Sequence, residues 1–336
     1  MRVITCASYY GTGSSAVTDF FSEFDDIYSL GDYEYRFLQE PDGIADLEYN
    51  LIENNHRHNT SDSIKRFLKY MTSLKRMGYG GYDIFGDQFE ILINKYIDEI
   101  VQLKTHTWWN KDRIDKGQLF CLVDRAYSLG KRLLTGNLHS EKKFSLLQNR
   151  EWGYYTAISK EDFLKATRKL VNDLLAIVNK NNMPFVMVDQ MVPPTNTERF
   201  IRYFDDVKII VVDRDPRDIY LLEKIFWQWG VIPVNDVGEF VTWFKITREH
   251  GRKAKEDTKK VFRVQFEDLV YNYEQMKKEL TQFVEIGLDK HISPLTCFNP
   301  QISIKNTNLK NRVKGYEKDI AYIEENLGKY LYSFGE

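Results

Sequence analysis

Three short runs in the second half of the chain constrain its fold most strongly. Residues 184–188, 207–212 and 261–264 read Pro-Phe-Val-Met-Val, Val-Lys-Ile-Ile-Val-Val and Val-Phe-Arg-Val, and segments with helical spacing separate them. Mostly apolar strands that alternate with helices are typical of a parallel sheet covered by helices on both faces. We therefore expect an α/β fold with a parallel central sheet. Ligands bind such sheets at the carboxyl ends of the strands.

The N-terminal segment has the pattern of a strand, a loop of small residues and a helix. Residues 3–21 read VITCASYYGTGSSAVTDFF. Gly11 and Gly13 allow the main chain to approach a ligand closely, and Ser14 and Ser15 offer hydroxyls where the N-terminus of the helix favours an anion. The segment therefore predicts a phosphate or sulfate site.

Two common nucleotide loops do not match this segment. The nucleoside-triphosphatase loop needs a lysine directly after Gly13 and a glycine five residues before it, where the chain has Ser14 and Ser8. The dinucleotide pattern G-x-G-x-x-G has Ala16 at its third glycine. An ordinary strand-to-helix turn of small residues is the alternative interpretation.

A second candidate for anion binding follows the strand at 207–212. The stretch VKIIVVDRDPRDIYL puts Arg214 and Arg217 at the end of a buried strand, at the edge of the sheet where we also expect the glycine loop. Two guanidinium groups there would form a forked receptor for an anion. A turn in which both arginines pair with the neighbouring aspartates is the alternative.

The middle of the chain is predicted to be helical. The capping pattern from Ser159 to Asp162 starts one of these helices. We expect helices at 60–77, 89–103 and 159–177, and short extended pieces at 26–30 and 33–38 around Gly31. We interpret residues 1–336 as a single α/β domain in which residues 40–182 form a large helical insertion.

Composition limits the classes of function. A net charge of −2 argues against a nucleic-acid-binding protein. No apolar run approaches the length of a transmembrane helix and no hydrophobic signal segment is evident, so we expect a cytoplasmic protein without a membrane span. Cys6, Cys121 and Cys297 lie far apart, which predicts buried small residues and neither disulfides nor a zinc site.

The order of these motifs resembles that of the sulfotransferases that use 3′-phosphoadenosine 5′-phosphosulfate (PAPS). Residues 12–15, Thr-Gly-Ser-Ser, resemble the end of that family's 5′-phosphosulfate loop, and residues 214–218, Arg-Asp-Pro-Arg-Asp, match its 3′-phosphate motif. Residues 264–269, Val-Gln-Phe-Glu-Asp-Leu, and residues 312–315, Arg-Val-Lys-Gly, are similar to two later segments. The resemblance implies a P-loop-like fold, PAPS and its product adenosine 3′,5′-bisphosphate (PAP) as ligands, and no metal. It implies that the nucleotide is bound by Gly11, Thr12, Gly13, Ser14, Ser15, Arg214, Arg217, Phe266, Arg312 and Lys314.

A further likeness is to the bacterial, carbohydrate and tyrosylprotein branches of the family. Residues 31–36, Gly-Asp-Tyr-Glu-Tyr-Arg, resemble an element in which a glutamate acts as the base. Glu34 is accordingly the predicted base, because an acceptor hydroxyl must lose its proton during transfer. A solvated glutamate in an aromatic-rich turn is the alternative.

The sequence also departs from the family's pattern. Gly11 and Gln190 stand where the family has cations, and Leu222 stands where a serine is usual. Cations that could compensate in catalysis are Arg36, Lys305, Lys310, Arg312 and Lys314.

We expect a sulfotransferase that acts on a hydroxyl of a glycan or glycan precursor, as in the modification of a bacterial polysaccharide. The insertion would bind this acceptor, and His106, next to Trp108 and Trp109, could line its pocket. The alternatives are a divergent P-loop kinase, which should have a loop lysine and magnesium ligands, and a relative that binds a nucleotide or glycan without catalysis. The sequence leaves the oligomeric state open.

Overall fold

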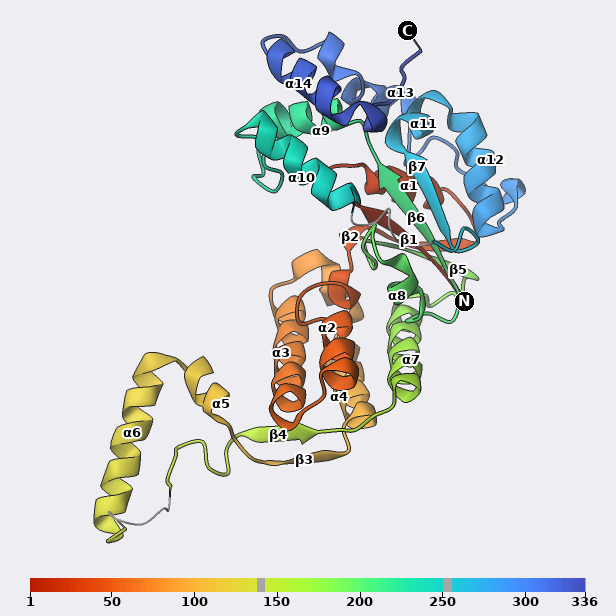
Figure 1. Ribbon diagram of the computed structural model, residues 1–336. Coiled ribbons are helices and arrows are strands. Elements are labelled where there is room, and N and C mark those ends of the chain that lie inside the picture. Colours follow the sequence, from red (N-terminus) through yellow and green to blue (C-terminus); the bar gives the residue numbers. More distant parts are fainter. Residues whose placement is uncertain (138–142, 250–255, 336) are drawn as a thin grey trace. The chain divides into compact units, whose positions relative to one another are not determined.

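The chain folds around a parallel five-stranded sheet. The computed structural model describes residues 1–137, 143–249 and 256–335. The strand order is β2-β5-β1-β6-β7, and every neighbouring pair is parallel. The strands are β1 (Arg2–Ser8), β2 (Ile27–Glu34), β5 (Phe185–Asp189), β6 (Val207–Asp213) and β7 (Val261–Gln265). The predicted parallel α/β fold is confirmed (Figure 1).

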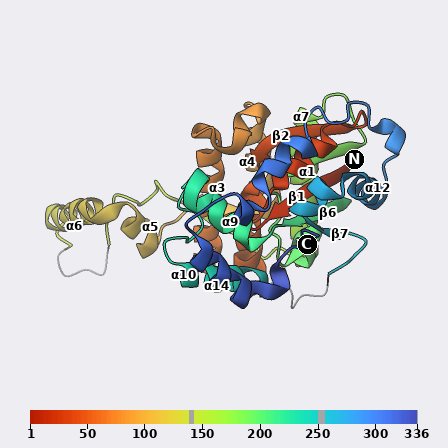
Figure 2. The same ribbon diagram turned by 90° about the horizontal axis from the view of Figure 1, so that it is seen from above.

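Helices cover both faces of this sheet. Ile4 and Cys6 of β1 belong to a core cluster that includes residues of α1 and α12, and the alternate residues Val3, Thr5 and Ala7 are buried as well. Because successive residues of a strand point to opposite faces, both faces of the sheet are covered at this central strand. Figure 2 shows helices surrounding these strands in a second view.

Backbone contacts divide the chain into two compact units. Unit 1 comprises residues 1–39, 78–86 and 171–336, and unit 2 comprises residues 40–77 and 87–170. The helices of unit 1 are α1 (Ser14–Phe21), α8 (Thr197–Ile201), α9 (Pro216–Leu221), α10 (Val237–Glu249), α11 (Phe266–Tyr271), α12 (Tyr273–Val284), α13 (Pro300–Ser303) and α14 (Glu317–Leu327).

Unit 2 is mainly helical. Its helices are α2 (Ile44–Glu48), α3 (Arg57–Arg76), α4 (Gln88–Ile100), α5 (Asn110–Asp115), α6 (Gly117–Leu134) and the first half of α7 (Lys160–Val178). Strands β3 (Leu103–His106) and β4 (Trp152–Tyr155) form an antiparallel pair. Phe67 of α3, Tyr96 of α4 and Phe163 of α7 pack together in its core.

The boundaries of two predicted elements are wrong. The predicted helix at 89–103 ends at Ile100, and Leu103 begins β3 instead. Only the first part of the predicted extended piece at 33–38 is a strand, because β2 runs through Gly31 to Glu34 and residues 36–38 form a 3₁₀ turn. The predicted cap of α7 is present: the Asp162 amide donates to Ser159 Oγ over 3.1 Å.

Candidate functional site

A cavity of about 630 Å³ lies at the carboxyl ends of the parallel strands of unit 1. Each of the five strands contributes a lining residue at or directly after its last position. In strand order these residues are Glu34, Asp189, Ser8, Arg214 and Phe266. The volume is in the range of ordinary small-molecule sites. The sheet therefore presents the site where ligands bind α/β folds.

The loop between β1 and α1 forms one wall of this cavity. Tyr10, Gly11 and Gly13 all have positive φ angles, of 68°, 66° and 92°. A Cβ atom at Gly13 would lie 2.5 Å from Cδ2 of Phe266, so only glycine fits there. Gly13 is also the N-cap of α1 and offers no side chain to cap it. The loop thus brings backbone amides at a helix N-terminus close to the cavity, as predicted for an anion site.

The loop hydroxyls have different surroundings. Ser14 and Ser15 line the cavity, but Thr12 does not. The hydroxyl of Thr12 is buried and donates to the Val212 carbonyl over 2.7 Å. Thr12 was predicted to bind the nucleotide, but its side chain instead attaches the loop to β6.

Arg214 is the buried cation of the site. It is 4% exposed, lines the cavity and lies over the ring of Phe266, with 4.3 Å between its Cζ and the ring centroid. Its guanidinium donates to the carbonyls of Gly11 and Asn306. Its Nε has no hydrogen-bond partner among the described residues. Burial lowers the pKa of Arg214, and the negative charges of Glu267, Asp218 and Asp215 act in the opposite direction. A bound anion would compensate this desolvated charge.

Glu34 and Arg36 lie together at the cavity. Arg36 Nη2 is 2.7 Å from Glu34 Oε2, and Arg36 Nη1 donates to Tyr10 OH over 3.1 Å. The guanidinium also lies over the Tyr10 ring, 5.0 Å from its centroid. The side chain of Glu34 is 37% exposed and that of Arg36 is 12% exposed. The two residues predicted for catalysis thus form an ion pair, with the carboxylate open to solvent.

Asp189 was missed by the sequence analysis. It lines the cavity at the end of β5 and is 3% exposed. Its Oδ2 accepts a hydrogen bond from Ser14 Oγ over 3.2 Å, and its Oδ1 has no partner within the described part of the chain. Burial, and next the charge of Glu34, raise the pKa of Asp189 to about 8. At neutral pH this carboxyl is therefore mainly protonated, and it can donate a hydrogen bond.

Asp189→Asn should change how stability depends on pH. Between pH 4 and 8 the folded protein holds a proton on Asp189 that the unfolded chain has released, so this group costs stability as the pH rises. Asparagine has no such proton. The difference in melting temperature, variant minus wild type, should therefore be at least about 2–4 °C more positive at pH 8 than at pH 5. Calorimetric melting at both pH values measures this difference.

Asp25→Asn, in the exposed turn after α1, serves as the control for losing one charge. Equal shifts for Asp189→Asn at pH 5 and pH 8 would show that Asp189 is ionised in the folded protein at both pH values.

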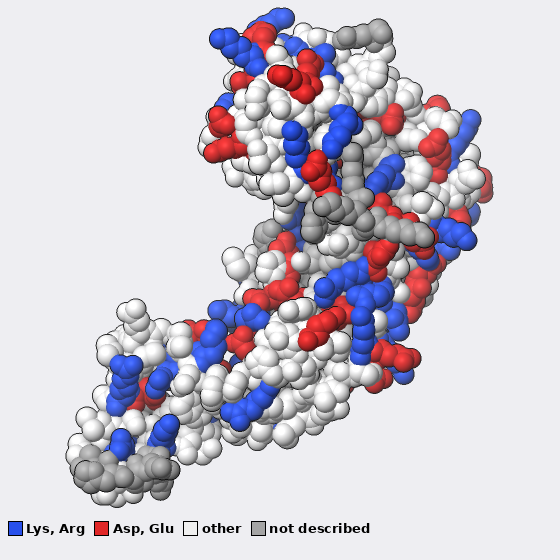
Figure 3. Space-filling model, in the orientation of Figure 1, with Lys and Arg blue, Asp and Glu red and all other residues white. Residues whose placement is uncertain are grey.

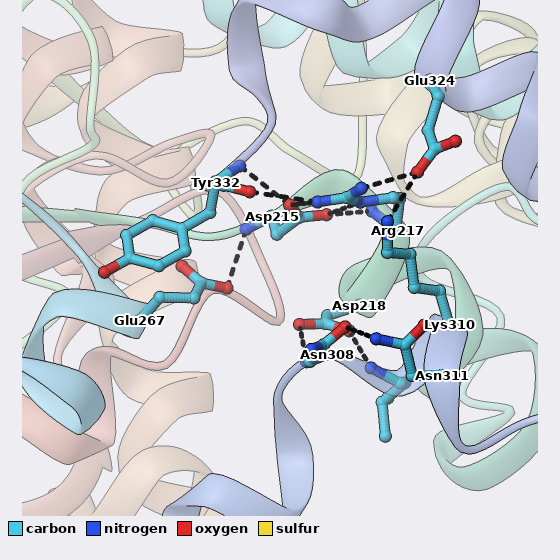
Figure 4. A network of polar contacts seen from close by, with 10 residues as sticks. Asp215, Arg217, Asp218, Glu267, Asn308, Lys310, Asn311, Glu324 and Tyr332 are labelled. Carbon is cyan, nitrogen blue, oxygen red and sulfur yellow. Dashed lines mark hydrogen bonds and ion pairs between the residues drawn. The ribbon is translucent and has the colours of Figure 1, made fainter. Parts of the chain in front are cut away.

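Three predicted nucleotide ligands lie away from the cavity. Arg217 is buried in a network in which Asp215 accepts from its backbone amide, its Nε and its Nη2, and Glu324 accepts from its Nη1 over 2.6 Å (Figure 4). Arg312 and Lys314 are exposed. None of the three is among the described residues that line the cavity. The first arginine of the R-D-P-R-D motif therefore faces the site, and the second holds the fold.

Aromatic and sulfur groups that the sequence did not single out also line the cavity. Trp227 and Trp229 are stacked, with ring centroids 5.3 Å apart, and a Cβ atom at Gly11 would lie 2.6 Å from Trp227. Gln228 between them directly follows a π-helical turn at Leu222–Trp227 and has a φ of 51°. Cys297 is exposed and lines the cavity, so the expectation of three buried cysteines is wrong.

A second cavity, of about 410 Å³, lies within unit 2. Trp108 and Trp109 line it, and His58 stacks on Trp109 with 3.7 Å between the ring centroids. His106 is not among its lining residues and stacks instead on Trp152. Trp108 and the stacked His58–Trp109 pair therefore line this cavity with aromatic surface.

In residues 1–137, 143–249 and 256–335, no group of three or more His, Cys, Asp or Glu side chains is placed to hold a metal ion. Within the same residues no helix is both long and apolar enough to cross a membrane.

No family model matches the chain, and no curated protein sequence matches it. Similar solved structures include the sulfotransferase domain of the Synechococcus PCC 7002 olefin synthase, with 12% identity over 99% of this chain and 96% of that one and a TM-score of 0.42. Sulfotransferase STF1 from Mycobacterium tuberculosis has 10% identity over 91% of this chain and 76% of that one, with a TM-score of 0.37.

A third solved structure is retinol dehydratase in complex with androsterone and the inactive cofactor PAP. It has 14% identity over 100% of this chain and 84% of that one, and its TM-score is 0.32.

Proposed function

We propose that this protein transfers a sulfuryl group from PAPS to a hydroxyl of a glycan or glycan precursor. The observation that carries the proposal is the convergence of the glycine loop, Arg214 and the Glu34–Arg36 pair on one cavity. The loop and Arg214 form an anion receptor, and Glu34 adds a carboxylate within the same space. The motif resemblance names the donor that such a receptor would hold.

The residues at the cavity fit a nucleotide with separated anionic groups. Gly13 has no room for a Cβ atom beside Phe266, so the loop at the cavity packs closely on this ring. Arg214 supplies a buried N–H with no partner among the described residues, suited to the 3′-phosphate. Phe266 and Trp227 supply aromatic faces for the adenine. PAPS brings the activated sulfuryl group, and the chain supplies the contacts.

The roles of the other residues follow from their chemistry. Glu34 would accept the proton of the acceptor hydroxyl, since it is a partly exposed carboxylate that lines the site. Arg36 would stabilise negative charge that develops during transfer, in place of the cation missing at Gly11. The amides of Gly13, Ser14 and Ser15 would hold the leaving phosphate. The neutral carboxyl of Asp189 would add a hydrogen-bond donor next to Ser14.

The acceptor is the least constrained part of the proposal. We assign its binding to the inserted residues 40–182, as expected from the sequence. The support is the cavity of unit 2, where Trp108 and the stacked His58–Trp109 pair supply aromatic surface against which a sugar ring can pack. The polar groups Asn59, Asp62 and Lys111 line the same cavity.

Nucleotide binding provides the direct test. PAP should bind in the micromolar range without a metal, and ATP should bind much more weakly, because the receptor holds two separated phosphates and its loop lacks the lysine of a triphosphate site. Isothermal titration calorimetry with each nucleotide, with and without Mg²⁺, measures both affinities. Magnesium-dependent binding of ATP without binding of PAP would instead indicate the kinase.

A nucleotide-binding protein without catalysis is the second candidate. Gln190 favours it, because its Nε2 donates to Ser14 Oγ over 3.1 Å and to Ser8 Oγ, at a position where the family has a cation. Turnover with labelled PAPS and candidate acceptors separates this candidate from an enzyme.

A further inference from the structure

Helix α6 exposes its apolar side and buries its only acidic residue. Asp124 is 2% exposed, and its Oδ1 accepts hydrogen bonds from Ser145 Oγ over 2.9 Å and from the Leu146 amide over 2.6 Å. The large apolar residues of the helix are at least half exposed at six positions, namely Leu119, Leu122, Val123, Leu129, Leu133 and Leu134. The helix is thus attached to its own unit through a polar side chain, and its apolar side chains face solvent.

These apolar residues form one broad face, which we call the α6 face. At 3.6 residues per turn the six side chains cover about 140° of the helix circumference, along a length of about 23 Å. This is wider than the seam of a two-stranded coiled coil, which uses two positions in seven. It has the width of a helix face that is buried along its whole length.

The charges next to the α6 face have one sign. Arg125 and Arg132 lie along one edge of the face, and Lys131 lies beyond the other edge. Asp124 is the only acidic residue of α6, and it is buried on the opposite side. In Figure 3 the lobe that holds α6, at the lower left, is mostly white and blue. The solvent-facing charge of the helix is therefore basic.

We propose that the α6 face docks on the surface of a membrane that contains anionic phospholipids. A helix with a broad apolar face and basic residues beside it lies in the interface of a bilayer, with its apolar side chains below the headgroups. The basic residues add attraction to anionic lipids. A second copy of the chain fits less well, because an antiparallel pair of α6 helices would bring Arg125 and Arg132 against their equivalents.

Vesicle sedimentation with the full-length chain tests this proposal. The wild type should sediment with vesicles of phosphatidylcholine and phosphatidylglycerol, and less with vesicles of phosphatidylcholine alone. The double variant Leu122→Glu/Leu129→Glu should lose at least ten-fold in partitioning, and Arg125→Glu/Arg132→Glu should lose the preference for the anionic vesicles. Both sets of positions lie on the helix surface, and circular dichroism verifies that the variants are folded.

Ile246→Glu is the matched control, since Ile246 on α10 is 64% exposed and Leu122 is 62% exposed. This variant should sediment like the wild type. The proposal fails if the wild type binds neither kind of vesicle, or if Ile246→Glu reduces binding as much as the α6 variants. It also fails if light scattering shows a dimer, Leu122→Glu/Leu129→Glu dissociates this dimer, and no vesicle binding is seen. The α6 face would then be an interface between two copies. These outcomes do not depend on the proposed enzymatic activity.

Discussion

Arg217→Ala is expected to lower the free energy of unfolding by about 3–5 kcal/mol, the usual cost of removing one partner of a buried ion pair. Arg217 is 5% exposed, and Asp215, which accepts from it three times, is 0% exposed. Without the guanidinium, Asp215 keeps only backbone donors, including the amide of Tyr332. Chemical denaturation of the nucleotide-free protein measures the loss.

Arg214→Ala is the matched comparison, one turn earlier in the same motif. It should weaken PAP binding by about 1.5–3 kcal/mol, the range for hydrogen bonds to charged groups, or roughly one to two orders of magnitude in Kd. The reason is that Arg214 lines the cavity and carries an Nε–H without a partner among the described residues. Calorimetric titration with PAP measures this affinity at a temperature where both variants are folded.

The two variants should therefore lose different properties: Arg217→Ala should lose stability, and Arg214→Ala should lose affinity for PAP. Arg217→Ala should bind PAP with nearly wild-type affinity once it is folded. If Arg217→Ala lost affinity as strongly as Arg214→Ala, the network in Figure 4 would have to open when the nucleotide binds. If Arg214→Ala bound PAP normally, Arg214 would be a residue of the fold alone.

The parallel sheet could be predicted from the sequence because its strands are buried on both faces. Such strands appear as apolar runs that helical segments separate, and each predicted run matches a strand of the sheet to within one residue at either end. Because the strands are parallel, their carboxyl ends lie at one edge of the sheet. Gly13 and Arg214 were therefore correctly expected at this edge.

The direction of individual side chains could not be predicted. Arg214 and Arg217 stand three residues apart in a motif with three acids, and only the structure shows that Asp215 at the N-cap of α9 takes the second arginine. Asp189 was missed because it ends an apolar strand, where one polar residue carries no pattern. Its role emerges from burial between Ser14 and Glu34, which are distant in sequence. Trp227 and Trp229 reach the cavity through a π-helical turn, which has no clear sequence signal.

Glu34→Gln is expected to lower turnover by about 100-fold or more, within the range that general base catalysis contributes. The amide keeps the shape of the side chain, and its oxygen can still accept from Arg36, so the local structure should persist. It cannot accept a proton from the acceptor hydroxyl. PAP affinity should stay near that of the wild type, because the loop and Arg214 are unchanged. Single-turnover rates with labelled PAPS and a proven acceptor measure the chemical step.

Asp189→Asn provides the control within the same cavity. Because burial raises the pKa of Asp189 to about 8, its carboxyl is mainly protonated at neutral pH, and only the minor ionised fraction could accept a proton there. This variant should retain most of its turnover at pH 7. If Glu34→Gln kept full turnover while Asp189→Asn lost it, Asp189 would be the base. If neither carboxyl mattered while the protein still transferred sulfate, no base from this pair would act, and orientation by the loop and the arginines would account for the rate.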